Sequence, residues 1–273
     1  YLDFDYDAIE NEFSVPILGS RNLLRAEERN QPRNQYYLLQ KAGIRMPRQF
    51  KSPSQIDRLA IVKVSEKERK FERAFFFASS AKDYEAHAAK LLKEGKITKQ
   101  ALEEAVIEEF ALGTQVNFNY FYSPLRCEVE LLGTDFRRQT NIDGILRLPA
   151  DQQARVLELV QPKLEESGHV ACTILESMLE VAMELGERFA LAIQKEYAPG
   201  IIGPLALQSA VLPGPPKKDV VVFDVSLRMP GSPGTRFTPY TEYLHGESLS
   251  AGRRLARELK NAVKAKKLEA VLT

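Results

Sequence analysis

The sequence has few cysteines, no long apolar run and no excess of charge of either sign. Its two cysteines, Cys127 and Cys172, have no CxxC spacing, so they give no sign of a disulfide framework and favour a reducing, cytoplasmic location. The 38 basic and 37 acidic side chains leave a net charge of +1, which gives no argument for nucleic acid or an acidic membrane as a partner. No run approaches the roughly 18 apolar residues of a membrane helix.

Common catalytic motifs are also missing. The chain contains no Walker A, GxSxG or HExxH pattern. No two of its three histidines have metal-ligand spacing, and His87 and the cysteines are interpreted as structural. The chemistry must therefore be sought in other residue types.

What is present is a chain able to bury a large core. At 273 residues with 44% apolar side chains, it forms one large domain or two intimate domains. It begins at Tyr1, and we expect further residues upstream in the natural protein. Patterning predicts an α+β fold with mostly antiparallel sheets. The expected elements are a helix capped by Ser20, a hairpin of strands 59–64 and 74–78, a helix over 173–197, neighbouring strands 201–212 and 219–225, and a helix over 249–267.

The most informative segment is the apolar strand that ends in Phe223-Asp224-Val225-Ser226-Leu227-Arg228. A carboxylate on such a strand is costly to bury without a cation, and the period of two places Asp224, Ser226 and Arg228 on one face. The preceding strand carries Gln208, which the hairpin would bring beside Asp224. Together they are suited to Mg²⁺ and an anionic substrate. A strand whose polar residues face solvent remains the alternative.

Two further segments suit a nucleotide. Lys63 ends an apolar strand, where an ammonium calls for a negative partner such as phosphate, unless it reaches solvent along its alkyl stem. The strand from Glu108 to Leu112 exits at Gly113, which suits contacts of its backbone and acids with adenine and ribose. A plain edge strand would have the same pattern.

The run from Asp135 to Gly144 gathers two arginines, two amides and two carboxylates. Arginine matches phosphate through its planar fork, so a nucleotide phosphate or ribose is expected nearby. A polar turn between strands is the alternative. His169 lies at an expected boundary between loop and strand.

In order along the chain, these segments resemble the formate-dependent FAICAR synthetases, ATP-grasp enzymes of archaeal purine (IMP) biosynthesis. The motifs that carry the resemblance are 15–25, 107–110, 121–125, 130–133, 141–144, 147–150, Gly203-Pro204 and 250–254. The resemblance implies an ATP-grasp fold of two lobes with nucleotide between them. It divides the chain into a remnant of an N-terminal domain with a linker helix at 1–50, a small lobe at 51–116 and a large lobe at 117–273.

The implied reaction is the ATP-dependent formylation of AICAR to FAICAR through formyl phosphate, catalysed by a homo-oligomer. The resemblance implies Gln208 and Asp224 as ligands of Mg²⁺ or Mn²⁺ and Arg228 as a catalytic residue. The residues assigned to ATP are Lys63, Glu108, Glu109, Phe110, Ala111 and Gln139. Those assigned to AICAR are Arg137, Asn141 and His169.

Three departures from the family pattern keep other functions open. The loop after Lys63, residues 65–73, contains no glycine to cradle phosphate. Gln139 stands where a glutamate is usual, and His169 where an asparagine is usual. Most of the family's N-terminal domain is missing before Tyr1. The alternatives are a ligase for another acid and amine, or a silent paralogue that binds nucleotide without turnover.

Overall fold

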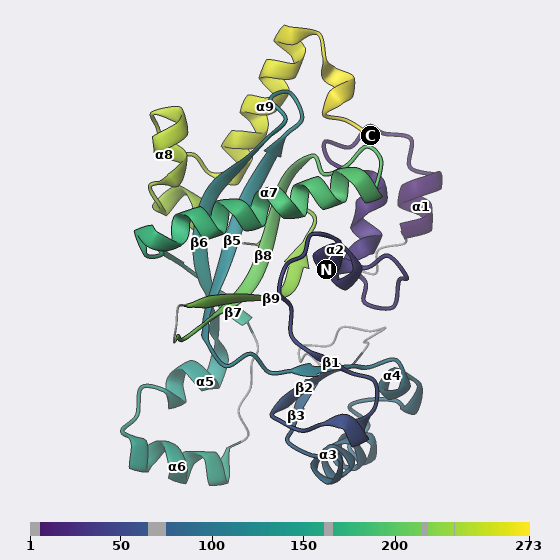
Figure 1. The fold of residues 1–273 in the computed structure, drawn as a ribbon, viewed down its shortest axis with the longest axis vertical. Coiled ribbons are helices and arrows are strands. Elements are labelled where there is room, and N and C mark those ends of the chain that lie inside the picture. The colour runs from purple at the N-terminus through teal and green to yellow at the C-terminus, as the bar shows by residue number, and fades with distance from the viewer. Residues whose placement is uncertain (1–5, 65–74, 161–165, 215–217, 232) are drawn as a thin grey trace. The chain divides into compact units, whose positions relative to one another are not determined.

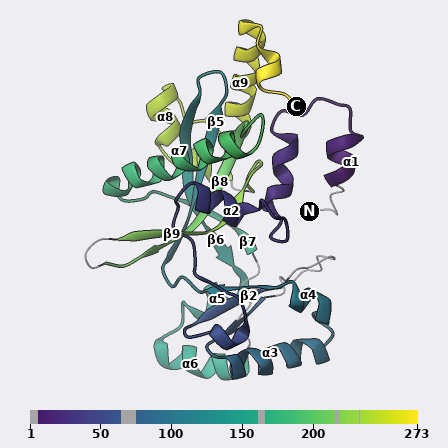
Figure 2. The same cartoon turned by 45° about the vertical axis from the view of Figure 1, so that its right-hand side comes forward.

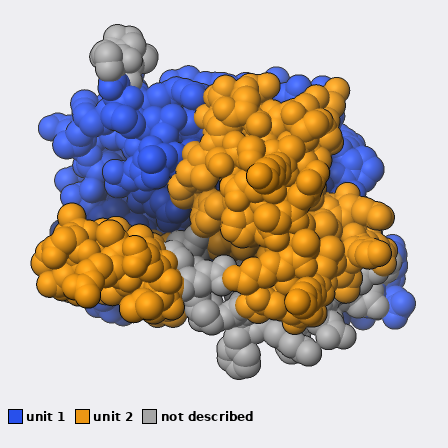
Figure 3. Space-filling view, turned by 90° about the horizontal axis from the view of Figure 1, so that it is seen from below, with its two compact units in different colours: residues 1–46, 111–136, 171–273 blue, residues 47–110, 137–170 orange. Residues whose placement is uncertain are grey.

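The computed structural model describes residues 6–64, 75–160, 166–214, 218–231 and 233–273. They fall into two compact units, which Figure 3 colours separately. Unit 1 comprises residues 1–46, 111–136 and 171–273, and unit 2 comprises 47–110 and 137–170. In the described ranges, no helix combines the length and the apolarity that a bilayer crossing demands.

Unit 2 is built on a four-stranded antiparallel sheet of order β1-β4-β2-β3. Helix α3 packs on it, with Tyr84 and Ala88 joining Phe76 and Val62 in a buried apolar cluster. The elements of this unit are β1 (Gln49–Phe50), η2 (Pro53–Gln55), β2 (Ala60–Lys63), β3 (Phe75–Ala78), α3 (Ala81–Lys93), α4 (Lys99–Glu103), β4 (Val106–Glu109), α5 (Thr140–Ile145) and α6 (Ala150–Leu159).

The second sheet has five strands in the order β7-β6-β5-β8-β9 and belongs to unit 1, except for residues 137–139 of β6 and 166–170 of β7. Its strands are β5 (Thr114–Ser123), β6 (Glu128–Gln139), β7 (Glu166–Cys172), β8 (Gly203–Leu212) and β9 (Asp219–Ser226). The other elements of unit 1 are α1 (Tyr6–Asn11), η1 (Arg21–Glu27), α2 (Gln35–Lys41), η3 (Glu176–Met178), α7 (Leu179–Glu196), η4 (Pro233–Phe237), α8 (Tyr240–His245), α9 (Ala251–Ala265) and η5 (Leu268–Ala270).

One face of this sheet is apolar and packs against a helix. Helix α7 runs across strands β5 and β8 in both ribbon views (Figures 1 and 2). Its Phe189 and Ile193 lie in one buried cluster with Phe118 and Tyr120 of β5 and Leu205 of β8. Because strand side chains alternate between faces, the residues between these point to the opposite face. Those residues are largely polar and form the candidate site.

The expected hairpin is confirmed, because β2 and β3 pair antiparallel with Lys63 opposite Phe75. The hairpin of β8 and β9 and the helix α7 are confirmed as well. The expected cap by Ser20 is wrong: its hydroxyl donates to the carbonyl of Gly200 and makes no cap bond to the 3-10 helix η1. The glycine-free loop 65–73 lies outside the described residues.

Candidate functional site

A row of polar side chains crosses four strands on the polar face of the five-stranded sheet. Asn117 of β5 is in register with Asp135 of β6 on one side and with Gln208 of β8 on the other. Gln208 is in turn directly opposite Asp224 of β9. Cross-strand partners point to the same face. We call Asp135, Asn117, Gln208 and Asp224 the polar row, and it confirms the expected adjacency of Gln208 and Asp224.

Gln208 provides a buried oxygen that suits a cation. Its residue is 5% exposed, and Oε1 has no hydrogen-bond partner among the described atoms. Leaving such an acceptor unsatisfied costs about 1–3 kcal/mol, which a bound donor or metal ion would recover. Beside it, a carboxylate oxygen of Asp224 accepts a hydrogen bond from Nη2 of Arg29 at 3.1 Å. An amide oxygen and a carboxylate are ligands that fit Mg²⁺.

The two oxygens do not make a self-sufficient metal cage. Within the described ranges, no group of three or more histidine, cysteine, aspartate or glutamate side chains is placed to hold a metal ion. Mg²⁺ usually takes one or two protein ligands and leaves the remaining positions to phosphate oxygens and water. The Gln208 and Asp224 pair therefore fits an ion that arrives with a nucleotide.

Residues near the chain's start cover the outer edge of β9. Glu27 accepts a hydrogen bond from the backbone N–H of Leu227 at 2.6 Å, and Oε1 of Gln35 accepts one from the N–H of Val225 at 3.0 Å. Glu27 also pairs with Nε of Arg228 at 3.3 Å. Burial raises the pKa of Glu27, although Arg228 opposes the shift. Arg228 follows the end of β9, and its ion pair with Glu27 links it to the segment that covers the strand edge.

In unit 2, the predicted nucleotide residues lie on neighbouring strands. The ammonium of Lys63 on β2 forms an ion pair with Glu108 on β4, whose side chain is 1% exposed. Glu109 faces the other way and pairs with Nη1 of Arg58 at 3.4 Å. The N–H of Phe110 donates to the carbonyl of Leu59 at 2.9 Å. The fold thus brings Lys63 and Glu108 together, and the two side chains neutralise each other within the protein.

Two of the three residues predicted for AICAR share one carboxylate. Glu166 of β7 pairs with Nε of Arg137 at 3.0 Å and with Nε2 of His169 at 2.6 Å. Asn141 lies on helix α5 and Gln139 immediately precedes that helix. The N–H of Gln139 donates to Asp143 at 2.5 Å. The run from Asp135 to Gly144 is therefore the end of a strand followed by a helix, which excludes the alternative of a polar turn between strands. His169 lies within β7, not at its boundary.

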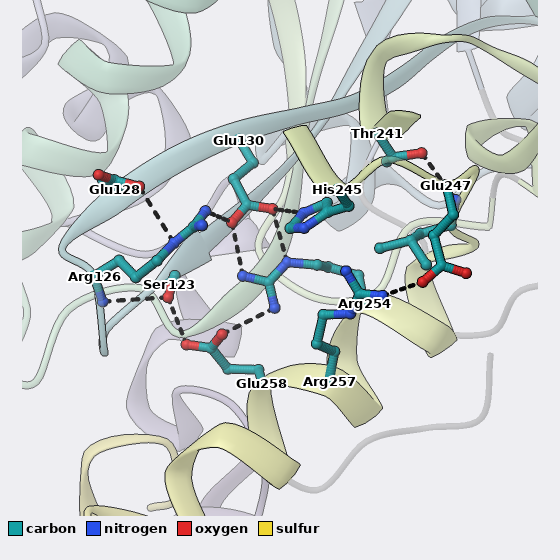
Figure 4. Close-up of polar contacts among 11 residues, drawn as sticks. Ser123, Arg126, Glu128, Glu130, Thr241, His245, Glu247, Arg254, Arg257 and Glu258 are labelled. Carbon is teal, nitrogen blue, oxygen red and sulfur yellow. Dashed lines mark hydrogen bonds and ion pairs between the residues drawn. The ribbon is translucent and has the colours of Figure 1, made fainter. Parts of the chain in front are cut away.

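Sequence reasoning missed two clusters of buried polar residues. On β5 and β6, the amides of Asn117 and Asn119 both donate to Asp135, at 2.8 and 2.6 Å. A second cluster is centred on Glu130, whose carboxylate accepts two hydrogen bonds from Arg254, each at 2.7 Å (Figure 4). The alternation of Asn117-Phe118-Asn119 was the signal available for the first. The second had no local signal, because Glu130 and Arg254 are far apart in the chain.

The two antiparallel sheets with their helices have the ATP-grasp fold, as comparison with solved structures shows. A solved D-Ala:D-Ser ligase, VanG of Enterococcus faecalis, shares the fold with a TM-score of 0.56 at 16% identity, covering 89% of this chain and 64% of that one. The crystal structure of an IMP biosynthesis protein PurP from Thermococcus kodakaraensis aligns with a TM-score of 0.69 at 26% identity, over 98% of this chain and 76% of that chain.

Sequence comparison identifies the particular family. The chain is 37% identical over 270 residues to the 5-formaminoimidazole-4-carboxamide-1-(beta)-D-ribofuranosyl 5'-monophosphate synthetase of Methanocaldococcus jannaschii, covering 98% of this chain and 72% of the relative. It is 38% identical to the synthetase of the same name from Methanopyrus kandleri, with the same coverage. A domain of unknown function, DUF1297, matches residues 83–273, and a protein of unknown function, DUF1246, matches 2–50. The chain belongs to this synthetase family, the FAICAR synthetases.

Proposed function

We propose that this protein uses ATP to join formate to the amine of AICAR, giving FAICAR, ADP and phosphate in IMP biosynthesis. The observation that carries the proposal is the 37% identity to a FAICAR synthetase over 98% of the chain. In this reaction formate is phosphorylated to formyl phosphate. The amine then attacks the formyl carbon, phosphate leaves, and the nitrogen loses a proton. The protein's contribution is to position the reactants and to neutralise charge.

Gln208 and Asp224 are proposed to hold Mg²⁺ or Mn²⁺. When bound, the ion would neutralise charge on phosphate oxygens. The unsatisfied Oε1 of Gln208 supports this role. Arg228 is proposed as the catalytic cation that stabilises the transferred phosphoryl group, and its pairing with Glu27 at 3.3 Å would hold the guanidinium in place.

ATP is proposed to contact Lys63, Glu108, Glu109, Phe110, Ala111 and Gln139. Lys63 would bind phosphate oxygens, and Glu108 would limit the free movement of its ammonium by the observed ion pair. Strand β4 ends at Glu109, and one further bond, from the N–H of Phe110 to the carbonyl of Leu59, follows it before Ala111. That position suits contacts with the adenine edge.

AICAR is proposed to contact Arg137, Asn141 and His169. The arrangement around Glu166 supports this assignment for Arg137 and His169, because one carboxylate orients both side chains. An arginine and a histidine present donors that match a ribonucleotide phosphate. Formate and AICAR are the proposed substrates, and a homo-oligomer in the cytoplasm is the proposed form of the enzyme.

The direct test is incubation of the purified protein with ATP, formate, AICAR and Mg²⁺, followed by chromatography for FAICAR. Product formation that requires all four components is expected. Absence of product across a range of pH and with both Mg²⁺ and Mn²⁺ would contradict the proposal. ADP release stimulated by another acid and not by formate would identify a ligase of different specificity. Nucleotide binding by calorimetry without any turnover would identify a silent paralogue.

A further inference from the structure

Asp135 fixes the orientation of a neighbouring asparagine on the polar face of the sheet. The Nδ2 of Asn119 donates to Oδ2 of Asp135 at 2.6 Å and lies 3.3 Å from the carbonyl oxygen of Gly133. A carboxylate and a carbonyl only accept hydrogen bonds, so both require the amide nitrogen of Asn119 to face them. The amide oxygen must then point away from Asp135. The chemistry of its partners sets this orientation.

That oxygen is buried without a partner. Asn119 is 1% exposed, and its Oδ1 has no hydrogen-bond partner within the part of the chain that the structure describes. The hydroxyl of Thr235 is also buried and has no hydrogen-bond partner among the described residues. The two residues flank the same point of strand β6: Asn119 is in register with Gly133, and a Cβ on Gly133 would lie 2.8 Å from Cα of Thr235. Glycine at 133 therefore leaves room for Thr235 beside Asn119.

Unsatisfied groups of this kind cost about 1–3 kcal/mol each, and a ligand that pairs with them recovers that cost on binding. Both N–H groups of Asn119 are occupied, so the amide offers only an acceptor. Thr235 can accept or donate. The complementary ligand group is therefore a hydrogen-bond donor, and a planar base offers such donors as N–H groups. Among the reactants proposed above, formate and the phosphate groups carry no N–H. Adenine carries an amino group, but it is proposed above to contact the backbone at the end of β4. The amine and the amide of the aminoimidazole carboxamide are the remaining N–H donors.

We propose that Asn119 and Thr235 bind the N–H groups of the aminoimidazole carboxamide base, with Asp135 holding Asn119 in the accepting orientation. This inference rests on the proposed function and adds a subsite for the base to the residues proposed above for AICAR. The polar row places the subsite on the same sheet face as Gln208 and Asp224. The amine would thus be held on the face that carries the metal ligands.

The experiment compares two threonines in one short segment. Thr235→Val removes the unpartnered hydroxyl at nearly constant size. Thr238→Val removes a hydroxyl that already donates within the protein, 3.0 Å from the carbonyl oxygen of Thr235 and 3.3 Å from that of Leu132. Affinity for AICAR, and separately for Mn²⁺ with ATP, is measured by calorimetry on the whole chain. Thermal unfolding of each variant checks that it is folded.

Thr235→Val is expected to weaken AICAR binding about tenfold, the loss of one hydrogen bond, while Thr238→Val leaves it within about twofold. Asn119→Leu is expected to weaken AICAR binding at least as much as Thr235→Val does, and to retain the affinity for Mn²⁺ and ATP. Unchanged AICAR affinity in folded Thr235→Val protein would overturn the inference, as would an equal loss in Thr238→Val. Loss of Mn²⁺ or ATP affinity in place of AICAR affinity would assign these atoms to the metal or to adenine. The binding measurement needs no turnover, so a wild-type protein that binds AICAR without forming FAICAR contradicts only the proposed function.

Discussion

At the residue scale, Glu27 is a carboxylate whose burial conflicts with its charge. Burial raises its pKa above 4.5 in the folded protein, against the opposing effect of Arg228. A raised pKa means that the folded state binds the proton more tightly than the unfolded state does. The resulting stabilisation is complete below pH 4.5 and is lost as the pH rises through the folded pKa.

Glu27→Gln removes this titration and keeps a side-chain oxygen for the N–H of Leu227. The free energy of unfolding of wild type relative to Glu27→Gln is therefore expected to fall as the pH rises above 4.5 and through the folded pKa. Urea unfolding of both proteins at several pH values measures the difference. A difference that grows with pH would mean that Arg228 dominates and that the pKa of Glu27 is lowered.

Gln208 is expected to promote metal binding and to lower the free energy of unfolding of the metal-free protein. Gln208→Leu removes a buried oxygen that has no hydrogen-bond partner in the described chain, so the free energy of unfolding should rise by about 1 kcal/mol in the absence of metal. The same change should weaken Mn²⁺ binding in the presence of ATP by roughly 10–100-fold, the loss expected even for an outer-shell partner of a metal ligand. Electron paramagnetic resonance of free Mn²⁺ measures the affinity.

Gln208→Glu is the matched control, since it keeps an oxygen ligand at the same position and should retain Mn²⁺ binding. A Gln208→Leu protein that binds Mn²⁺ as tightly as wild type would show that Gln208 is not a metal ligand.

The adjacency of Gln208 and Asp224 was predictable from the sequence, because a hairpin with a period of two places partners on one face. The role of Asn119 was not, because its partner Asp135 lies on the next strand and the register is a property of the fold.

At the element scale, helix α9 is attached to the sheet by a buried charge network (Figure 4). Arg254 of α9 is 2% exposed and pairs with Glu130 of β6 and with Glu258 one turn along the helix. Its guanidinium also lies 4.0 Å from the ring centroid of Phe121. Burial alone would raise the pKa of Glu130, but Arg254, His245 and Arg126 together hold it below its usual range.

Arg254→Met is expected to lower the free energy of unfolding by roughly 3 kcal/mol, because it leaves the buried carboxylates with less compensation. Arg257→Met is the matched control on the same helix. Its side chain is 33% exposed and pairs with the exposed Glu247, so its effect should stay within about 0.5 kcal/mol. Equal effects of the two changes in urea unfolding would contradict a stabilising network around Arg254.

Periodicity predicted the long helix α7 and both hairpins, because each is specified by local alternation or by a spacing of three to four residues. It failed where a distant partner decides the conformation. Ser20 has the residue type of a helix cap, yet its hydroxyl bonds to Gly200. The run after Asp135 is polar like a turn, yet β6 continues to Gln139 within the sheet. In both places a tertiary contact overrides the local preference.

At the scale of the whole molecule, the expected residue ranges 1–50, 51–116 and 117–273 are contiguous, whereas the compact units are not. Residues 137–170 belong to unit 2 although they follow a strand that starts in unit 1. Residues 1–46 belong to unit 1, where Glu27 and Gln35 bond to the edge of β9. Sequence periodicity cannot show which distant segments pack into the same unit, because contacts between them produce no repeating pattern in the local sequence.

Nucleotide and metal together should stabilise the whole protein. A ligand that binds only the folded state at about 100 times its Kd adds about 2.7 kcal/mol, which for a chain of this size raises Tm by roughly 5 °C or more. Because Gln208 and Asp224 are proposed to supply only two of the metal ligands, the shift should require Mn²⁺ and ATP together and disappear with EDTA. Differential scanning fluorimetry measures it, with Gln208→Leu as the variant expected to show little shift. An undiminished shift with ATP and EDTA would mean that nucleotide binds independently of the metal pair, through contacts such as those proposed for Lys63.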